Sequence, residues 1–103
     1  PIEPHGELTG LYRYLADAGR FTECVTGLSL PVAQEAANAR LEAAYGRAAR
    51  KTPGQPLRVK LEGTLSRRPA VEGDGTETAL VVNRVIRVGP EQDCPKEKAP
   101  DFR

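Results

Sequence analysis

The sequence predicts a mainly β domain with a single helix, and three observations support this prediction. Short segments rich in β-forming residues are separated by turn residues, with ten glycines and nine prolines in 103 residues. Only one segment has the 3.6-residue periodicity of an amphipathic helix. The length allows one domain and is too short for two of usual size.

Three strands are expected before the helix. Residues 7–16 form the first, with apolar side chains at both parities and a bend at Gly10. Residues 17–19 are expected to form a tight turn, with their glycine supplying a positive φ. The second strand then spans residues 20–26, and a short third strand spans residues 28–32.

The helix is expected at residues 33–51. Five residues recur on one helical face: Ala37, Leu41, Ala44, Tyr45 and Ala48. Basic residues in the last turn suit the negative end of the helix dipole. The segment 52–56, with two prolines and a glycine, ends the helix.

Two further strands follow, at residues 57–65 and 78–88, with a loop at residues 66–77 between them. The order of three strands, one helix and two strands is that of a five-stranded Greek-key barrel of the OB type. In this arrangement the helix closes one end of the barrel. We therefore expect an OB-fold domain at residues 7–95, with tails at residues 1–6 and 96–103.

Composition excludes several classes of function. Lysine plus arginine and aspartate plus glutamate number 15 and 14, so the charge balance provides no strong field for nucleic acid or anionic membranes. The longest apolar run, residues 79–82, is far short of the ~20 residues that span a bilayer. The chain begins without an initiator methionine, so an upstream region or signal peptide is expected to have been removed.

The two cysteines, Cys24 and Cys94, are the informative residues. An even number, a small core and positions beside turns favour one disulfide, with two independent thiols as the alternative. A disulfide would place the protein in an oxidising compartment, either the periplasm or outside the cell. Neither cysteine lies in a CxxC motif, and His5 is the only histidine, so no metal site is expected.

No residues are grouped for catalysis, and we expect neither enzymatic activity nor a cofactor. OB barrels often bind oligonucleotides or oligosaccharides on strands two and three. Core and cross-strand packing is the favoured interpretation of Tyr12, Tyr14 and Phe21, and a small aromatic platform on this face is the alternative. The near-zero charge argues against nucleic acid as the partner.

Residues 6–95 resemble the C-terminal OB domain of NlpE-type bacterial envelope lipoproteins, a group associated with copper resistance and envelope stress. The resemblance rests on residues 10–17 (GLYRYLAD), 21–24 (FTEC), Gly27, 31–32 (PV), 41–45 (LEAAY), 53–57 (PGQPL), 61–63 (LEG), 80–82 (LVV) and Cys94. It implies an OB barrel with a Cys24–Cys94 disulfide and a periplasmic location, with outer-membrane attachment through a lipid anchor outside this chain.

The resemblance also has limits. The CxxC motif of the family's N-terminal domain and the lipidated cysteine are absent from this sequence, so copper binding does not carry over. The main hypothesis is a monomeric, non-enzymatic module that binds an envelope protein or another envelope component, or contributes to stress sensing. The alternatives are an OB-type binder of single-stranded nucleic acid or oligosaccharide, and a purely structural spacer domain.

Overall fold

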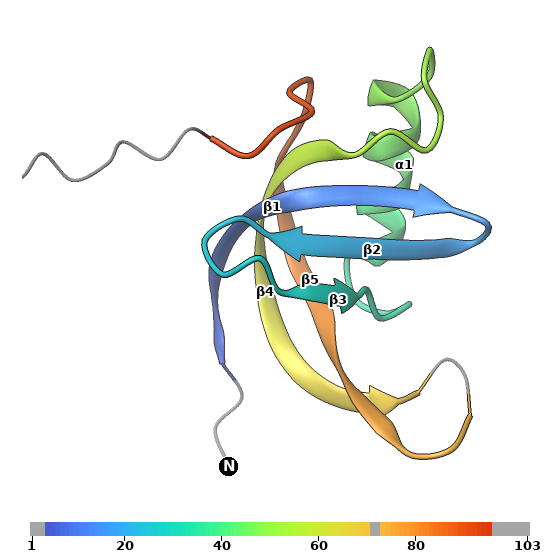
Figure 1. Ribbon diagram of the computed structural model, residues 1–103, viewed down its shortest axis with the longest axis vertical. Helices are drawn as coiled ribbons and strands as arrows, with labels where there is room; N and C mark the ends of the chain where they lie inside the picture. The colour runs from blue at the N-terminus through green and yellow to red at the C-terminus, as the bar shows by residue number, and fades with distance from the viewer. Residues whose placement is uncertain (1–3, 71–72, 96–103) are drawn as a thin grey trace, which may run out of the picture.

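The computed structural model describes residues 4–70 and 73–95, and the predicted tail at 96–103 lies outside them. This part of the chain contains five strands and one helix (Figure 1). Their bounds are β1 His5–Leu15, β2 Ala18–Glu23, β3 Ser29–Pro31, α1 Asn38–Ala48, β4 Leu57–Pro69 and β5 Thr76–Val88.

The strands form one sheet in the order β3-β2-β1-β4-β5, and every neighbouring pair is antiparallel. The sheet curls until its two edges meet, where Val32 forms a parallel bridge with Leu80. Beside it, the backbone N–H of Ala33 donates to the carbonyl oxygen of Leu80 at 2.8 Å. The predicted five-stranded barrel with a helix between the third and fourth strands is therefore confirmed.

Strand β1 changes partners near its middle. Residues 5–12 pair with β4, whereas residues 10–15 pair with β2. Gly10 lies in the overlap, where the ring of Phe21 packs directly over its backbone. A Cβ atom at Gly10 would lie 2.4 Å from Cζ of Phe21 and 2.5 Å from the carbonyl oxygen of Thr22. The close approach of β2 to the bend in β1 therefore requires glycine.

Replacing Gly10 with alanine should lower the free energy of unfolding by roughly 1–3 kcal/mol, the range for overpacking a filled core. Urea denaturation followed by circular dichroism measures this. Gly6→Ala is the matched control, because Gly6 lies in the same strand and a Cβ there would meet nothing within 4 Å. Equal stability of the two variants would contradict the packing argument.

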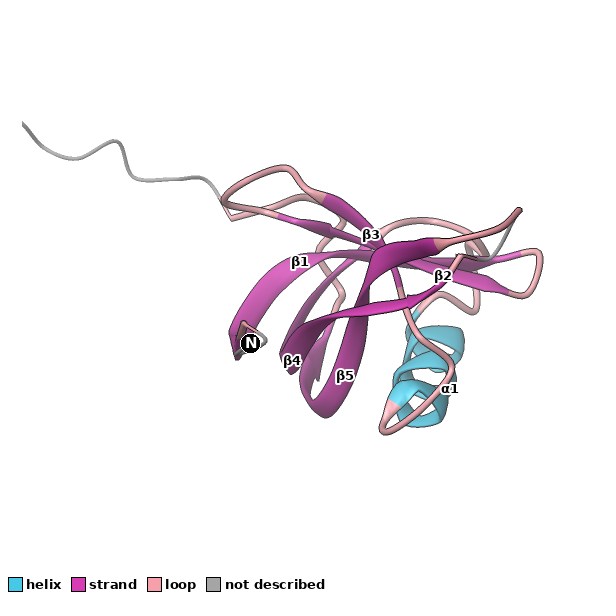
Figure 2. Cartoon of the chain, turned by 90° about the horizontal axis from the view of Figure 1, so that it is seen from below, coloured by secondary structure: helices cyan, strands magenta, loops and turns pink. Residues whose placement is uncertain are grey.

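The core fills the barrel and continues under α1. Its largest fully buried side chains are Tyr12, Phe21, Leu41, Leu61, Leu80, Val59 and Val82. The helix contributes Leu41 and Tyr45, and the ring of Tyr45 meets that of Tyr12 edge-on with centroids 5.3 Å apart. Figure 2 shows α1 (cyan) at one end of the curved strands, as the apolar face of the sequence predicts. No helix among the described residues is long and apolar enough to cross a membrane.

The helix begins at Asn38, five residues later than predicted. The segment before it closes the barrel, since the backbone N–H of Ala37 donates to the carbonyl oxygen of Val82 at 2.9 Å. Ala36 has a φ of 53°, which no α-helix accommodates. At the other end the helix stops at Ala48, three residues before the predicted end, and Arg47 is the basic residue in its last turn. Alanine-rich periodicity alone could not reveal that barrel closure uses these residues.

Two turns also differ from the prediction. The β1–β2 turn is formed by Ala16 and Asp17, both with positive φ. Gly19 lies in β2 instead, where it pairs with Tyr14 of β1. A two-residue turn in which both residues have positive φ has a backbone twist that matches the right-handed twist of the two strands it joins. The β4–β5 hairpin is longer than expected, with pairing that continues to Pro69 and Thr76. The sequence pattern did not predict this extension of the two strands, because the alternation of apolar residues ends where the hairpin leaves the core.

Candidate functional site

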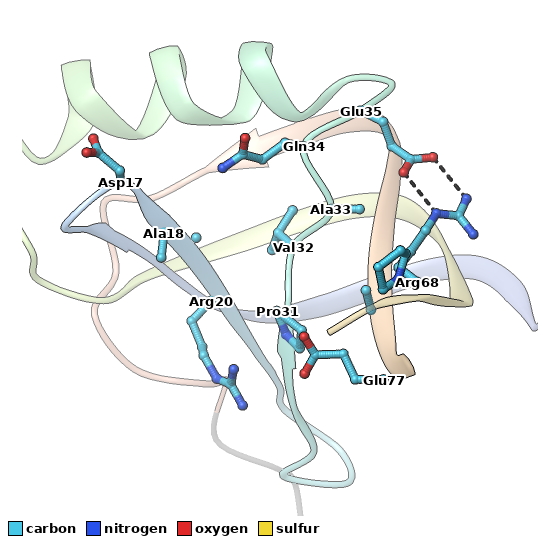
Figure 3. A pocket seen from close by; sticks show the side chains of 13 residues that line it. Asp17, Ala18, Arg20, Pro31, Val32, Ala33, Gln34, Glu35, Arg68 and Glu77 are labelled. Carbon is cyan, nitrogen blue, oxygen red and sulfur yellow. Dashed lines mark hydrogen bonds and ion pairs between the residues drawn. The ribbon is translucent and has the colours of Figure 1, made fainter. Parts of the chain in front are cut away.

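A groove of about 590 Å³ lies on the outer surface of the barrel (Figure 3). One wall is formed by the β1–β2 turn and the start of β2, and the other by the loop end of the β4–β5 hairpin. The end of β3 and the segment that follows it form the floor. In OB folds, ligands bind on strands two and three, between the loops that join strands one to two and four to five. The groove lies at this position.

The floor of the groove is apolar and its rim is charged. Pro31, Val32 and Ala33 line the floor, and Val32 is only 7% exposed. On the rim, Arg68 of β4 forms a two-pronged ion pair with Glu35. Its Nε and terminal nitrogen donate to the two carboxylate oxygens, both at 2.9 Å (Figure 3). This geometry fixes one wall of the groove.

The hydrogen bonds from Arg68 lower the pKa of Glu35 below its ordinary value of 4.5, and the arginine charge adds to the effect. Because the pKa is lowered on folding, the resulting stabilisation is complete above pH 4.5. It is lost as the pH falls through the lower folded-state value. An NMR titration of the Glu35 carboxyl carbon should therefore give a midpoint below 4.5. Arg68→Gln should move the midpoint toward 4.5, and an unchanged midpoint in that variant would contradict the assignment.

A third rim residue, Arg20 of β2, points away from the Glu35–Arg68 pair. Its Nε donates to Oγ of Ser29 on the neighbouring strand at 2.8 Å. Sequence reasoning did not identify Arg20, Glu35 or Arg68 as site residues. Their positions in the predicted OB topology could have identified them, because this topology indicates which turns flank a ligand site.

The alternative of an aromatic platform is not formed. Tyr12 and Phe21 are fully buried in the core, as the favoured interpretation of core packing expects, so the possible ligand face of Tyr12, Tyr14 and Phe21 is wrong for these two residues. Their side chains occupy the inward positions of β1 and β2. Burial also raises the pKa of Tyr12 above its ordinary value. Tyr14 is half-buried and lines a smaller cavity of about 340 Å³ beside the N-terminus of α1, together with Asn38 and Glu42.

Cys24 and Cys94 form a disulfide, with their Cα atoms 5.7 Å apart. It joins the loop after β2 to the segment after β5, across a sequence separation of 70 residues. The two cysteines are partly exposed. Among residues 4–70 and 73–95, no three histidine, cysteine, aspartate or glutamate side chains are grouped to hold a metal ion.

The loop beside the disulfide is held by Glu23. Its carboxylate accepts hydrogen bonds from the backbone N–H groups of Val25 and Thr26, both at 2.8 Å, and from the Thr26 hydroxyl at 2.7 Å. The pKa of Glu23 is lowered overall, because these hydrogen bonds outweigh its partial desolvation. The loop holds Val25 82% exposed and Leu28 48% exposed.

The chain is therefore an OB-type domain with one disulfide and with a charged groove beside strands two and three. The chain belongs to the NlpE C-terminal OB domain family, whose model matches residues 2–95.

Two comparisons agree with this membership. The chain is 34% identical over 87 residues to Lipoprotein NlpE of Escherichia coli (strain K12), covering 84% of this chain and 35% of that protein. It also matches the crystal structure of the Cpx pathway activator NlpE from Escherichia coli. That match has a TM-score of 0.73 and 29% identity, and covers 90% of this chain and 46% of the other. The chain therefore spans about a third of its curated relative.

Proposed function

We propose that this domain is a protein-interaction module of a periplasmic envelope-stress lipoprotein, and that it contacts another envelope component through the groove. Membership of the NlpE C-terminal family supports the envelope-stress setting. The observation that carries the interaction is the groove itself, with its apolar floor and charged rim at the ligand position of the OB fold. Attachment to the outer membrane would come from a lipid anchor outside this chain.

The chemistry of the groove favours a polypeptide over a single-stranded nucleic acid. Binding of unpaired bases depends on stacked aromatic side chains beside a basic track. None of the described residues that line the groove is aromatic, and its rim carries both signs of charge. An apolar centre surrounded by a polar rim is the arrangement found at protein–protein interfaces.

Filling the groove tests this proposal. Ala18 is exposed and lines the groove, so Ala18→Trp should obstruct it. Ala43→Trp is the matched control, since Ala43 is exposed on α1 and lies outside the groove. Each variant is expressed in its native polypeptide context, in bacteria that carry an envelope-stress reporter, and folding is checked by circular dichroism.

We expect a weaker reporter response from Ala18→Trp and an unchanged response from Ala43→Trp. A normal response from folded Ala18→Trp would remove the groove as the contact surface. If deleting the whole domain also left the response unchanged, the spacer alternative would be correct.

The disulfide has a second candidate role, as a reporter of the redox state of the periplasm. Its partial exposure and its position beside a loop that presents Val25 and Leu28 support this role. Loss of the bond would release the loop from the C-terminal segment. The double-cysteine variant described in the Discussion distinguishes this role from a purely structural one.

A further inference from the structure

We infer that the segment bound in the groove is an acidic polypeptide with apolar neighbours, and that Arg13 and Arg20 anchor its carboxylate. This inference rests on the proposed function, because it names the chemistry of the partner at the same groove. It is carried by two arginines that are cross-strand partners and form no ion pair with a described carboxylate. Arg20 lines the groove, and Arg13 lies beside it on β1, outside the groove lining.

Arg13 and Arg20 are direct cross-strand partners on β1 and β2. Directly opposed residues point to the same face of a sheet, with their Cβ atoms about 4.5–5.5 Å apart, and like charges at such positions are destabilising. Both side chains are exposed. No carboxylate among residues 4–70 and 73–95 lies within 4 Å of either guanidinium.

The other strand arginines provide a contrast. Four of them have a carboxylate partner on the surface: Arg58 with Glu91 at 3.8 Å, Arg68 with Glu35 at 2.9 Å, Arg84 with Glu62 at 3.0 Å, and Arg87 with Glu91 at 3.2 Å. Most of the other strand arginines therefore have their charge neutralised by a carboxylate, whereas Arg13 and Arg20 do not. A bound carboxylate would supply the missing negative charge.

Arg20 is also oriented for such a contact. The hydrogen bond from its Nε to Ser29 fixes the side chain, while its terminal nitrogens form no hydrogen bond with residues 4–70 and 73–95. A guanidinium held in one orientation loses less entropy when it binds a carboxylate. Because Arg20 itself lines the groove, a carboxylate held there would lie beside the apolar floor at Pro31 and Val32.

A polypeptide accounts for these features better than an anionic lipid surface. Asp17, Glu35 and Glu77 also line the groove, so this face as a whole is not basic and would repel a layer of anionic headgroups. A peptide can place one acidic side chain against the arginine pair and avoid the other carboxylates. Its neighbouring apolar side chains can cover the floor, which a phosphate group would leave exposed.

The test is selection of random short peptides, displayed on phage, by the full 103-residue chain. The selected peptides are then titrated into isotope-labelled protein to locate the contact by NMR. The variant is Arg13→Gln/Arg20→Gln. Arg47→Gln/Arg50→Gln is the control with the same change in charge, since these arginines lie near the C-terminal end of α1, outside the groove.

We expect selected peptides rich in aspartate or glutamate next to apolar residues, with NMR shifts at Arg20 and Val32. The double variant should weaken their binding at least about fivefold, the effect of losing one surface ion pair, and the control should leave binding unchanged. Peptides that bind the groove without an acidic preference, and equally well to both variants, would overturn the inference and leave the proposed function intact.

Two other outcomes reach further. If no peptide binds at the groove, both the inference and the groove-based function fail. If, in addition, vesicles of phosphatidylglycerol bind the chain in a manner that depends on Arg13 and Arg20, the site recognises a lipid headgroup and the polypeptide assignment is wrong.

Discussion

Replacing Cys24 and Cys94 with serine should lower the free energy of unfolding by about 4 kcal/mol. The bond closes a loop with a sequence separation of 70 residues, and the chain-entropy model gives a value of about this size for such a loop. A small barrel has little other stability in reserve, so the midpoint of urea denaturation should fall steeply. Reduction of the wild-type protein should reproduce the effect.

The matched control for this prediction is Val25→Ser. Val25 follows Cys24 in the same loop and is 82% exposed, so its replacement should change stability by about 0.5 kcal/mol or less. If the double-cysteine variant were as stable as this control, the disulfide would not be the staple of the domain.

The same double variant tests redox reporting when it is expressed in bacteria with an envelope-stress reporter. If the disulfide reports oxidising conditions, the response of the variant should no longer change when periplasmic disulfide formation is impaired. Reduced stability with a normal redox-dependent response would leave the bond with a structural role alone.

Phe21→Ala should lower the free energy of unfolding by about 3–5 kcal/mol, the range for removal of a buried aromatic ring. Phe21 is fully buried on β2, and its ring packs over the backbone of Gly10. The protein cannot fill this space with another side chain at low cost, because the surrounding strands are fixed by pairing on both sides.

Leu15→Ala is the control for this prediction. Leu15 is 52% exposed at the end of β1, so its truncation should cost about 1 kcal/mol or less. Urea denaturation of both variants measures the difference. If Phe21→Ala kept its stability and instead lost binding of a peptide or oligosaccharide, Phe21 would belong to a ligand face and its assignment to the core would be wrong.

Phe21 also illustrates what sequence patterns can and cannot specify. The sequence pattern of β2 predicts a strand that contains an aromatic residue. Alternate side chains of a strand point to opposite faces, so this residue could face either the core or a ligand. The direction depends on which side of the strand the barrel closes over. The sheet order and the Val32–Leu80 bridge determine that direction.

The start of the helix shows a related limit. Residues 33–37 have the alanine-rich composition of a helix, and local propensity therefore favours continuing it. In the structure, Ala33 and Ala37 instead donate backbone hydrogen bonds to Leu80 and Val82. These partners lie more than 40 residues away, so no local window contains the information that sets the boundary.

The fold class of this domain and the importance of its two cysteines could be predicted without a structure. Strand alternation, the single helical period and the order of elements are local or sequential properties, and they specify an OB barrel. The position of the groove, in contrast, follows only from the tertiary structure. The groove is made from Arg20, Val32, Glu35 and Arg68, which come from different segments and become neighbours only when the sheet closes. The Arg13–Arg20 pair likewise depends on strand register, which the hairpin turn fixes and composition does not reveal.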